Sequence, residues 1–85
     1  MPVSLIDLPL QQLAVIREVK SVAGGADATA LRRMAEIGFL PGEIVKVVAR
    51  IPGGDPIAVR VASSTFALRR REASSVQVQV LQPNE

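Results

Sequence analysis

The clearest structural signal in the chain is EIVKVVARIPGGDPIAVRVA, residues 43–62. Residues 43–51 are rich in β-branched aliphatic side chains and split into two alternating sets, which is typical of a strand. Residues 52–56 concentrate proline, glycine and aspartate and predict a hairpin loop, so residues 57–62 form the returning strand. One face of the first strand is predicted to carry Val45, Val47, Ala49 and Ile51. The returning strand is predicted to point inward with Ile57, Val59 and Val61.

One helix is predicted just before this hairpin. Asp27 can accept hydrogen bonds from the free N–H groups at a helix N-terminus, and Gly38 suits the left-handed residue that closes a helix. Pro41 then prevents the helix from resuming. Apolar side chains recur between these signals at near-helical spacing and predict a buried helix face, formed by Leu31, Met34, Ala35 and Ile37.

Alternating patterns predict further strands over residues 11–22, 65–68 and 75–81. Residues 1–10 contain two prolines and predict an extended leader and a turn, while residues 69–73 predict one helical turn. About five strands and one helix indicate a mainly β fold. Because alternating strands need one covered face, we expect a small closed barrel with the helix plugging one end.

Composition sets the class of protein. The chain has 85 residues, of which 48% are hydrophobic and 21% charged, so we expect one globular domain over 1–85 with a core from about 8 to 81. A net charge of +2 and only two aromatic residues do not predict a nucleic-acid partner. The first residues lack the pattern of an export signal, and no apolar run is long enough for a membrane span, which predicts a cytoplasmic protein.

The chemistry available to the chain is narrow, because it contains no cysteine and no histidine. Thiolate and imidazole metal ligands are therefore excluded, as are the commonest nucleophile–base pairs of enzymes. The carboxylates are scattered along the chain: Asp7, Glu18, Asp27, Glu36, Glu43, Asp55, Glu72 and Glu85. We expect no catalytic residue, no cofactor and no intrinsic metal site.

Residues 38–42, GFLPG, join the predicted helix to the strand that follows. In a structural interpretation Gly38 caps the helix, Pro41 turns the chain, and Phe39 or Leu40 attaches the helix to the barrel. In a functional interpretation one of these two apolar side chains is exposed as a partner contact. Both interpretations hold together when one of the pair is buried and the other exposed, in either order.

The loop over residues 52–56 also has two interpretations. Asp55 can hydrogen-bond its own main chain within a simple hairpin loop. Alternatively, Pro52 and Asp55 belong to a protruding recognition loop, whose two prolines limit the entropy lost on binding. The glycines do not predict a phosphate site, because no helix follows them and no Walker lysine is present.

Arg69, Arg70 and Arg71 form the one run of like charge in the sequence. In the structural interpretation this run is a solvated turn that Glu72 partly neutralises. In the functional one, Arg70 and Arg71 form a basic patch for an acidic partner surface or for anionic lipid headgroups. Three arginines are too few to indicate a nucleic-acid site.

Several short motifs, taken in order, make the sequence similar to the FeoA family, the small cytosolic partner of the FeoB ferrous iron transporter. The motifs are LRRM at 31–34, IGFLPG at 37–42, VKV at 45–47, PGGDPIAV at 52–59 and ALR at 67–69. The resemblance extends from about residue 8 to residue 80. It implies an SH3-like β-barrel, no catalysis, docking on the cytoplasmic region of FeoB, and modulation of iron uptake.

Three functional hypotheses follow. The first is docking on a FeoB-like transporter, so that the protein reaches the membrane only through that partner. The second is a regulatory module acting in trans, because the motifs also resemble the C-terminal SH3-like domain of DtxR-type iron-dependent repressors. The third is a self-associating barrel. The predicted partner-binding residues are Phe39, Leu40, Pro52, Asp55, Arg70 and Arg71.

Overall fold

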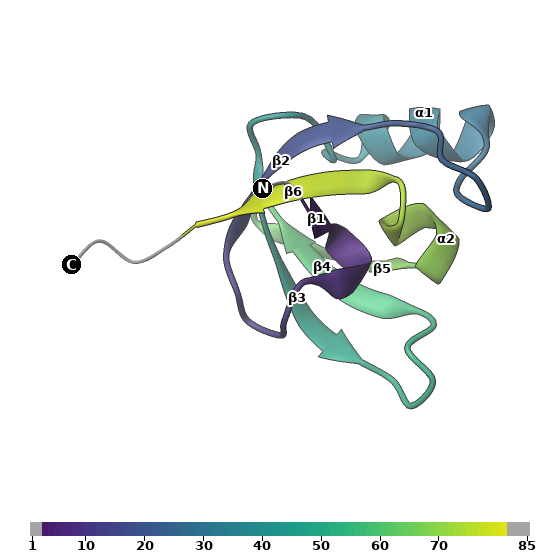
Figure 1. Cartoon of the computed structure of the whole chain (residues 1–85). Helices are drawn as coiled ribbons and strands as arrows, with labels where there is room; N and C mark the ends of the chain where they lie inside the picture. Colours follow the sequence, from purple (N-terminus) through teal and green to yellow (C-terminus); the bar gives the residue numbers. More distant parts are fainter. Residues whose placement is uncertain (1–2, 82–85) are drawn as a thin grey trace.

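The computed structural model describes residues 3–81, which form one sheet accompanied by short helices (Figure 1). In chain order the elements are β1 (Val3–Ser4), the 3₁₀ helix η1 (Leu5–Asp7), β2 (Ala14–Val19), α1 (Ala28–Glu36), β3 (Ile44–Arg50), β4 (Ile57–Val61), β5 (Ser64–Leu68), α2 (Arg70–Ala73) and β6 (Val76–Val80). The predicted mainly β fold is confirmed, with α1 between the first two long strands.

The sheet is antiparallel and has the strand order β1-β6-β2-β3-β4-β5. It curves around the core, but its edge strands β1 and β5 do not pair with each other within residues 3–81 (Figure 1). The sheet is therefore open, and the expectation of a closed barrel is wrong. Edge strand β1 has only two residues, which leaves little main chain for a closing ladder.

Two bulges change which side chains face the core. The β3–β4 register shifts between Val47 and Ala49. Val45 and Val47 are buried, as predicted, whereas Ala49 and Ile51 are exposed although strict alternation places them on the same face. A second shift interrupts the β2–β6 pairing. The extra residue of the β3–β4 irregularity lies in β3, so β4 keeps its regular alternation. The predicted inward residues of β4 are all buried: Ile57, Val59 and Val61.

The core lies on the concave side of the sheet and includes the N-terminal segment that the sequence indicates only as a leader and turn. Leu5 and Leu8 are both fully buried. The Arg50 guanidinium at the end of β3 donates hydrogen bonds to the main-chain carbonyls of Ile6 and Leu8, which ties η1 to the sheet. The fully buried side chains of the core are Leu5, Leu8, Ile16, Met34, Phe39, Val45, Val47, Ile57, Val59, Val61, Val76 and Val78.

Helix α1 begins and ends where the sequence predicts. The Asp27 side chain accepts a hydrogen bond from the Ala30 N–H at 2.9 Å and caps the first turn. Gly38 follows the helix with φ +118°, a conformation that glycine adopts readily. Met34 is buried against the core, so α1 covers one end of the curved sheet, but Ile37, predicted on the same helix face, is exposed.

Candidate interaction surfaces

Phe39 and Leu40 lie in opposite environments. Phe39 is fully buried, and its ring packs at a tilt against Phe66 with 6.1 Å between ring centroids. The positive φ of Gly38 turns the chain back beneath α1, so that the Phe39 N–H donates to the Met34 carbonyl at 2.9 Å. Leu40 is 45% exposed. Phe39 is therefore a core residue in this structure, and Leu40 is the accessible member of the pair.

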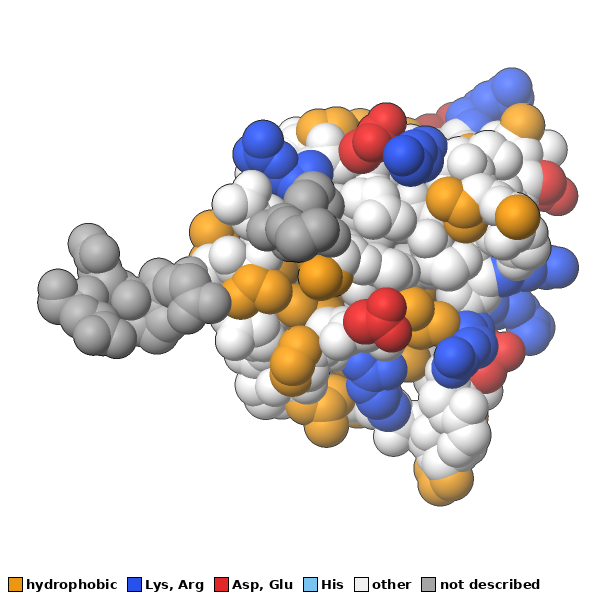
Figure 2. All heavy atoms as spheres, viewed as in Figure 1, with side chains coloured by type: hydrophobic (Ala, Val, Ile, Leu, Met, Phe, Trp, Pro, Cys, Tyr) orange, Lys and Arg blue, Asp and Glu red, His pale blue; other side chains and the backbone are white. Residues whose placement is uncertain are grey.

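The convex face of the sheet has a groove that we call the outer groove. It has a volume of about 360 Å³ and is lined by Leu13, Gly42, Glu43, Ile44, Val45, Lys46, Arg60 and Ala62. Leu13 and Ile44 are 47% and 44% exposed, and the Leu81 main chain pairs with that of Leu13. In Figure 2 hydrophobic side chains gather at this end of the molecule, where β2 begins and β6 ends.

Two cations stand at the edge of the outer groove. Lys46 on β3 and Arg60 on β4 are register partners on the convex face. Neither forms an ion pair with the carboxylates described in the structure. Like charges placed directly opposite each other favour a partner that supplies an anionic group. The groove was not predicted, although the alternation of Ile44 and Lys46 with buried residues already places both on the outer face.

A second hollow, which we call the arginine cleft, lies at the other end of β3. It has a volume of about 600 Å³ and is lined by Ile6, Gly24, Asp55, Arg69, Arg70, Arg71 and Ser74. It brings together Asp55, Arg70 and Arg71 from the predicted set, and the Asp55 carboxylate accepts a hydrogen bond from the Arg70 N–H at 3.1 Å. This bond replaces the predicted contact of Asp55 with its own main chain. Pro52 is exposed in the same hairpin loop.

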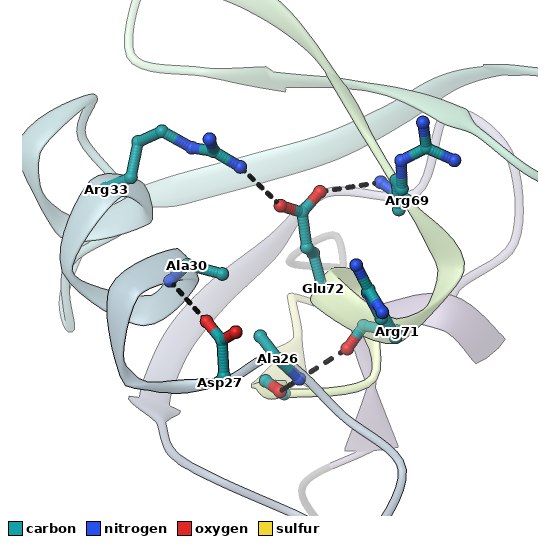
Figure 3. A network of polar contacts seen from close by, with 8 residues as sticks. Ala26, Asp27, Ala30, Arg33, Arg69, Arg71 and Glu72 are labelled. Atoms are coloured by element: carbon teal, nitrogen blue, oxygen red, sulfur yellow. Dashed lines mark hydrogen bonds and ion pairs between the residues drawn. The ribbon is translucent and has the colours of Figure 1, made fainter.

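The ion pair of Glu72 is with a cation outside the arginine run. The Glu72 side chain is only 9% exposed, and its carboxylate accepts from the Arg69 N–H at 2.8 Å and from Arg33 Nη2 at 3.0 Å (Figure 3). The pairing cation thus comes from α1. The guanidinium of Arg69 points away from this carboxylate in Figure 3. The arrangement joins α1 to α2, and Arg69 and Arg71 line a hollow beside it together with Asp27 and Glu72.

Two further observations concern the described part of the chain. Within residues 3–81, no three carboxylate side chains converge into a group that could hold a metal ion. None of the helices described there has the length and apolar character needed to span a bilayer.

A family model, described as the FeoA domain, matches residues 3–80. The chain belongs to the FeoA family. The match spans all of the elements from β1 to β6, so the family resemblance read from the motifs is confirmed.

Solved structures of FeoA proteins share the fold. The FeoA protein of Stenotrophomonas maltophilia, solved in complex with zinc and described as an unusual prokaryotic SH3 domain, is 41% identical to this chain. The similarity covers 91% of this chain and 89% of that protein, with a TM-score of 0.78. The predicted SH3-like fold is therefore confirmed, and the open sheet is compatible with it.

A curated relative carries the FeoA segment within a much larger polypeptide. It is the Fe(2+) transport protein A/Fe(2+) transporter FeoB fusion protein of Porphyromonas gingivalis, 32% identical over 53 residues. The match covers 62% of this chain, and this segment accounts for only 6% of the length of the fusion protein.

The fold also occurs in transcriptional regulators. A manganese-dependent transcriptional repressor shares it with a TM-score of 0.80, at 24% identity over 94% of this chain and 42% of the repressor. At this level of identity the likeness establishes a common fold alone. It gives no support to one function over another.

Proposed function

We propose that this protein is a non-enzymatic accessory protein of ferrous iron transport, which docks in the cytoplasm on a FeoB-type transporter and modulates iron uptake. The observation that carries the proposal is the Porphyromonas gingivalis relative, in which a FeoA segment and a FeoB transporter are one polypeptide. Covalent linkage holds two modules at high effective concentration. Docking of a FeoA domain on such a transporter also needs a surface on the domain that the transporter contacts.

The outer groove is the surface best suited to this docking. Leu13, which directly precedes β2, and Ile44, the first residue of β3, both expose apolar area in this groove, and exposed apolar side chains on a rigid scaffold make effective anchors. Lys46 and Arg60 add positive charge at the rim, which favours a partner segment with apolar and acidic residues. Leu40 precedes Gly42, a groove residue, and stays a candidate contact.

The chain provides a matched pair of variants for testing this surface. Ile44, the first residue of β3, is 44% exposed, and Ile51, which directly follows the last residue of β3, is 50% exposed. We expect Ile44→Ser to weaken binding to the purified cytoplasmic region of the transporter by about tenfold, the usual effect of losing an apolar anchor. Ile51→Ser should leave the affinity unchanged.

The measurement is isothermal titration calorimetry on three chains: unmodified, Ile44→Ser and Ile51→Ser. Equal affinities for the unmodified chain and both variants would show that the outer groove is not the docking site. No complex between the unmodified chain and either the cytoplasmic region or the intact transporter would overturn the proposed function itself.

A further inference from the structure

We propose that the arginine cleft is a binding site for a phosphate-bearing anion. Its walls come from segments that are far apart in the sequence: η1, the β2–α1 loop, the β3–β4 hairpin loop and α2. Lysine and arginine side chains are frequent on the side of the molecule where Figure 1 places α2 (Figure 2). A volume of about 600 Å³ lies within the usual range of small-molecule sites.

The positive charge of the cleft is available to a ligand. Among the described residues, no carboxylate forms an ion pair with Arg69, Arg70 or Arg71. Glu72, the nearest acid in the sequence, is occupied by Arg33 and by a main-chain N–H. Asp55 accepts from the main chain of Arg70. Three arginine residues therefore line one hollow together with a single acidic residue, and Arg69 and Arg71 also line a neighbouring hollow with Asp27 and Glu72.

The main chain that carries these arginines is well supported. The buried Ser75 hydroxyl accepts from the Ala26 N–H at 3.0 Å and donates to the Arg71 carbonyl at 3.4 Å, which joins the β2–α1 loop to α2 (Figure 3). The Ser74 hydroxyl donates to the same carbonyl at 2.7 Å. A Cβ placed on Gly54 would lie 3.6 Å from Arg70 Nη1, so this guanidinium rests beside the hairpin loop.

The geometry favours phosphate over a single carboxylate. A guanidinium is planar and always charged, and it offers paired donors that match phosphate oxygens. Three arginines at one hollow suit an anion with more than one phosphate group. Ile6 gives the wall an apolar portion, which accommodates an organic substituent on that anion.

Titration with sodium pyrophosphate at constant ionic strength tests the site, with amide chemical shifts as the readout. We expect saturable shifts at Gly24, Asp55 and residues 70–74. Arg70→Ala should weaken binding by about tenfold or more, since a lost charge-assisted hydrogen bond has effects of this size. Asp55→Asn should tighten binding, because it removes a repelling charge while its amide oxygen still accepts from the Arg70 N–H.

Arg32→Gln is the matched control. Arg32 is exposed on α1, and its loss lowers the net charge as Arg70→Ala does, but it does not line the cleft. The phosphate group could belong to a free anion or to a lipid headgroup. Binding to phosphatidylcholine vesicles with and without phosphatidylglycerol distinguishes these two sources. Saturation by pyrophosphate identifies a free anion, and Arg70-dependent capture by phosphatidylglycerol vesicles alone identifies a lipid headgroup.

The proposal would be overturned if neither pyrophosphate nor the phosphatidylglycerol vesicles bound to the protein. It would also be overturned if Arg32→Gln and Arg70→Ala lost affinity equally. The proposal is independent of transporter docking, because the arginine cleft and the outer groove share no residue. A negative result for the anion site therefore does not contradict transporter docking, and a negative result for docking does not contradict the anion site.

Discussion

Adjacent residues with the same apolar character have different roles at the end of α1. Phe39 is enclosed by the core and contacts Phe66, whereas Leu40 is nearly half exposed. Sequence pattern identifies the pair as one buried and one exposed residue but not their order. The order depends on Gly38, whose positive φ sets the direction of the next side chain, and that angle has no signature beyond the glycine itself.

The burial of Phe39 predicts a large effect on stability. Phe39→Ala should lower the free energy of unfolding by about 3–5 kcal/mol, because it leaves a cavity in the core. Leu40→Ala is the control and should cost less than about 1 kcal/mol, as expected for an exposed side chain. Urea unfolding followed by circular dichroism measures both values. Similar values for the two variants would contradict the placement of Phe39 in the core.

Glu72 is the residue whose environment differs most from the sequence interpretation. A glutamate after three arginines suggests a solvated ion pair, yet this one is buried between α1 and α2. The missed signal is its position three residues after Arg69, where a glutamate side chain can reach back to a free main-chain N–H. Its partner Arg33 lies 39 residues away and belongs to tertiary structure.

The two partners of this ion pair should contribute unequally. Glu72→Ala should lower the free energy of unfolding by about 2 kcal/mol, because it removes two hydrogen bonds and leaves the Arg69 N–H without its acceptor. Arg33→Ala should cost less than about 1 kcal/mol, since the Arg33 side chain is 66% exposed. Chemical denaturation of each variant gives the values. An Arg33→Ala effect as large as that of Glu72→Ala would be inconsistent with this arrangement.

At the scale of elements, local signals predicted α1 and the β3–β4 hairpin well. The Asp27 cap, the Gly38 terminus and the turn residues of 52–56 act over a few residues, so they can be recognised in the sequence alone. The bulges in β2 and β3 cannot, because each depends on the register with a neighbouring strand. Strand β1 was missed because two residues carry no alternation.

The cap at Asp27 gives a prediction at this scale. Asp27→Ala should lower the free energy of unfolding by about 1 kcal/mol, because the Ala30 N–H loses its acceptor. Asp27→Asn keeps an acceptor oxygen and should have a much smaller effect. Thermal unfolding of the two variants makes the comparison. Equal destabilisation by alanine and asparagine would indicate that charge, and not capping, is the role of Asp27.

At the scale of the whole molecule, the predicted partner residues separate into two surfaces. Leu40 lies before β3 and near the outer groove, while Pro52, Asp55, Arg70 and Arg71 lie beyond the other end of β3. Sequence motifs could not reveal this division, because the fold alone brings the hairpin loop and α2 together. The division permits a protein partner on one side of the sheet and a phosphate-bearing anion at the other end.

The most direct test of the central claim is binding of the unmodified chain to a FeoB-type transporter in phosphatidylcholine nanodiscs, with empty nanodiscs as the reference. Biolayer interferometry measures binding of the chain to both kinds of disc. We predict saturable binding to the discs that contain the transporter and none to the empty discs. Absence of binding to the transporter, or equal binding to both kinds of disc, would contradict the account.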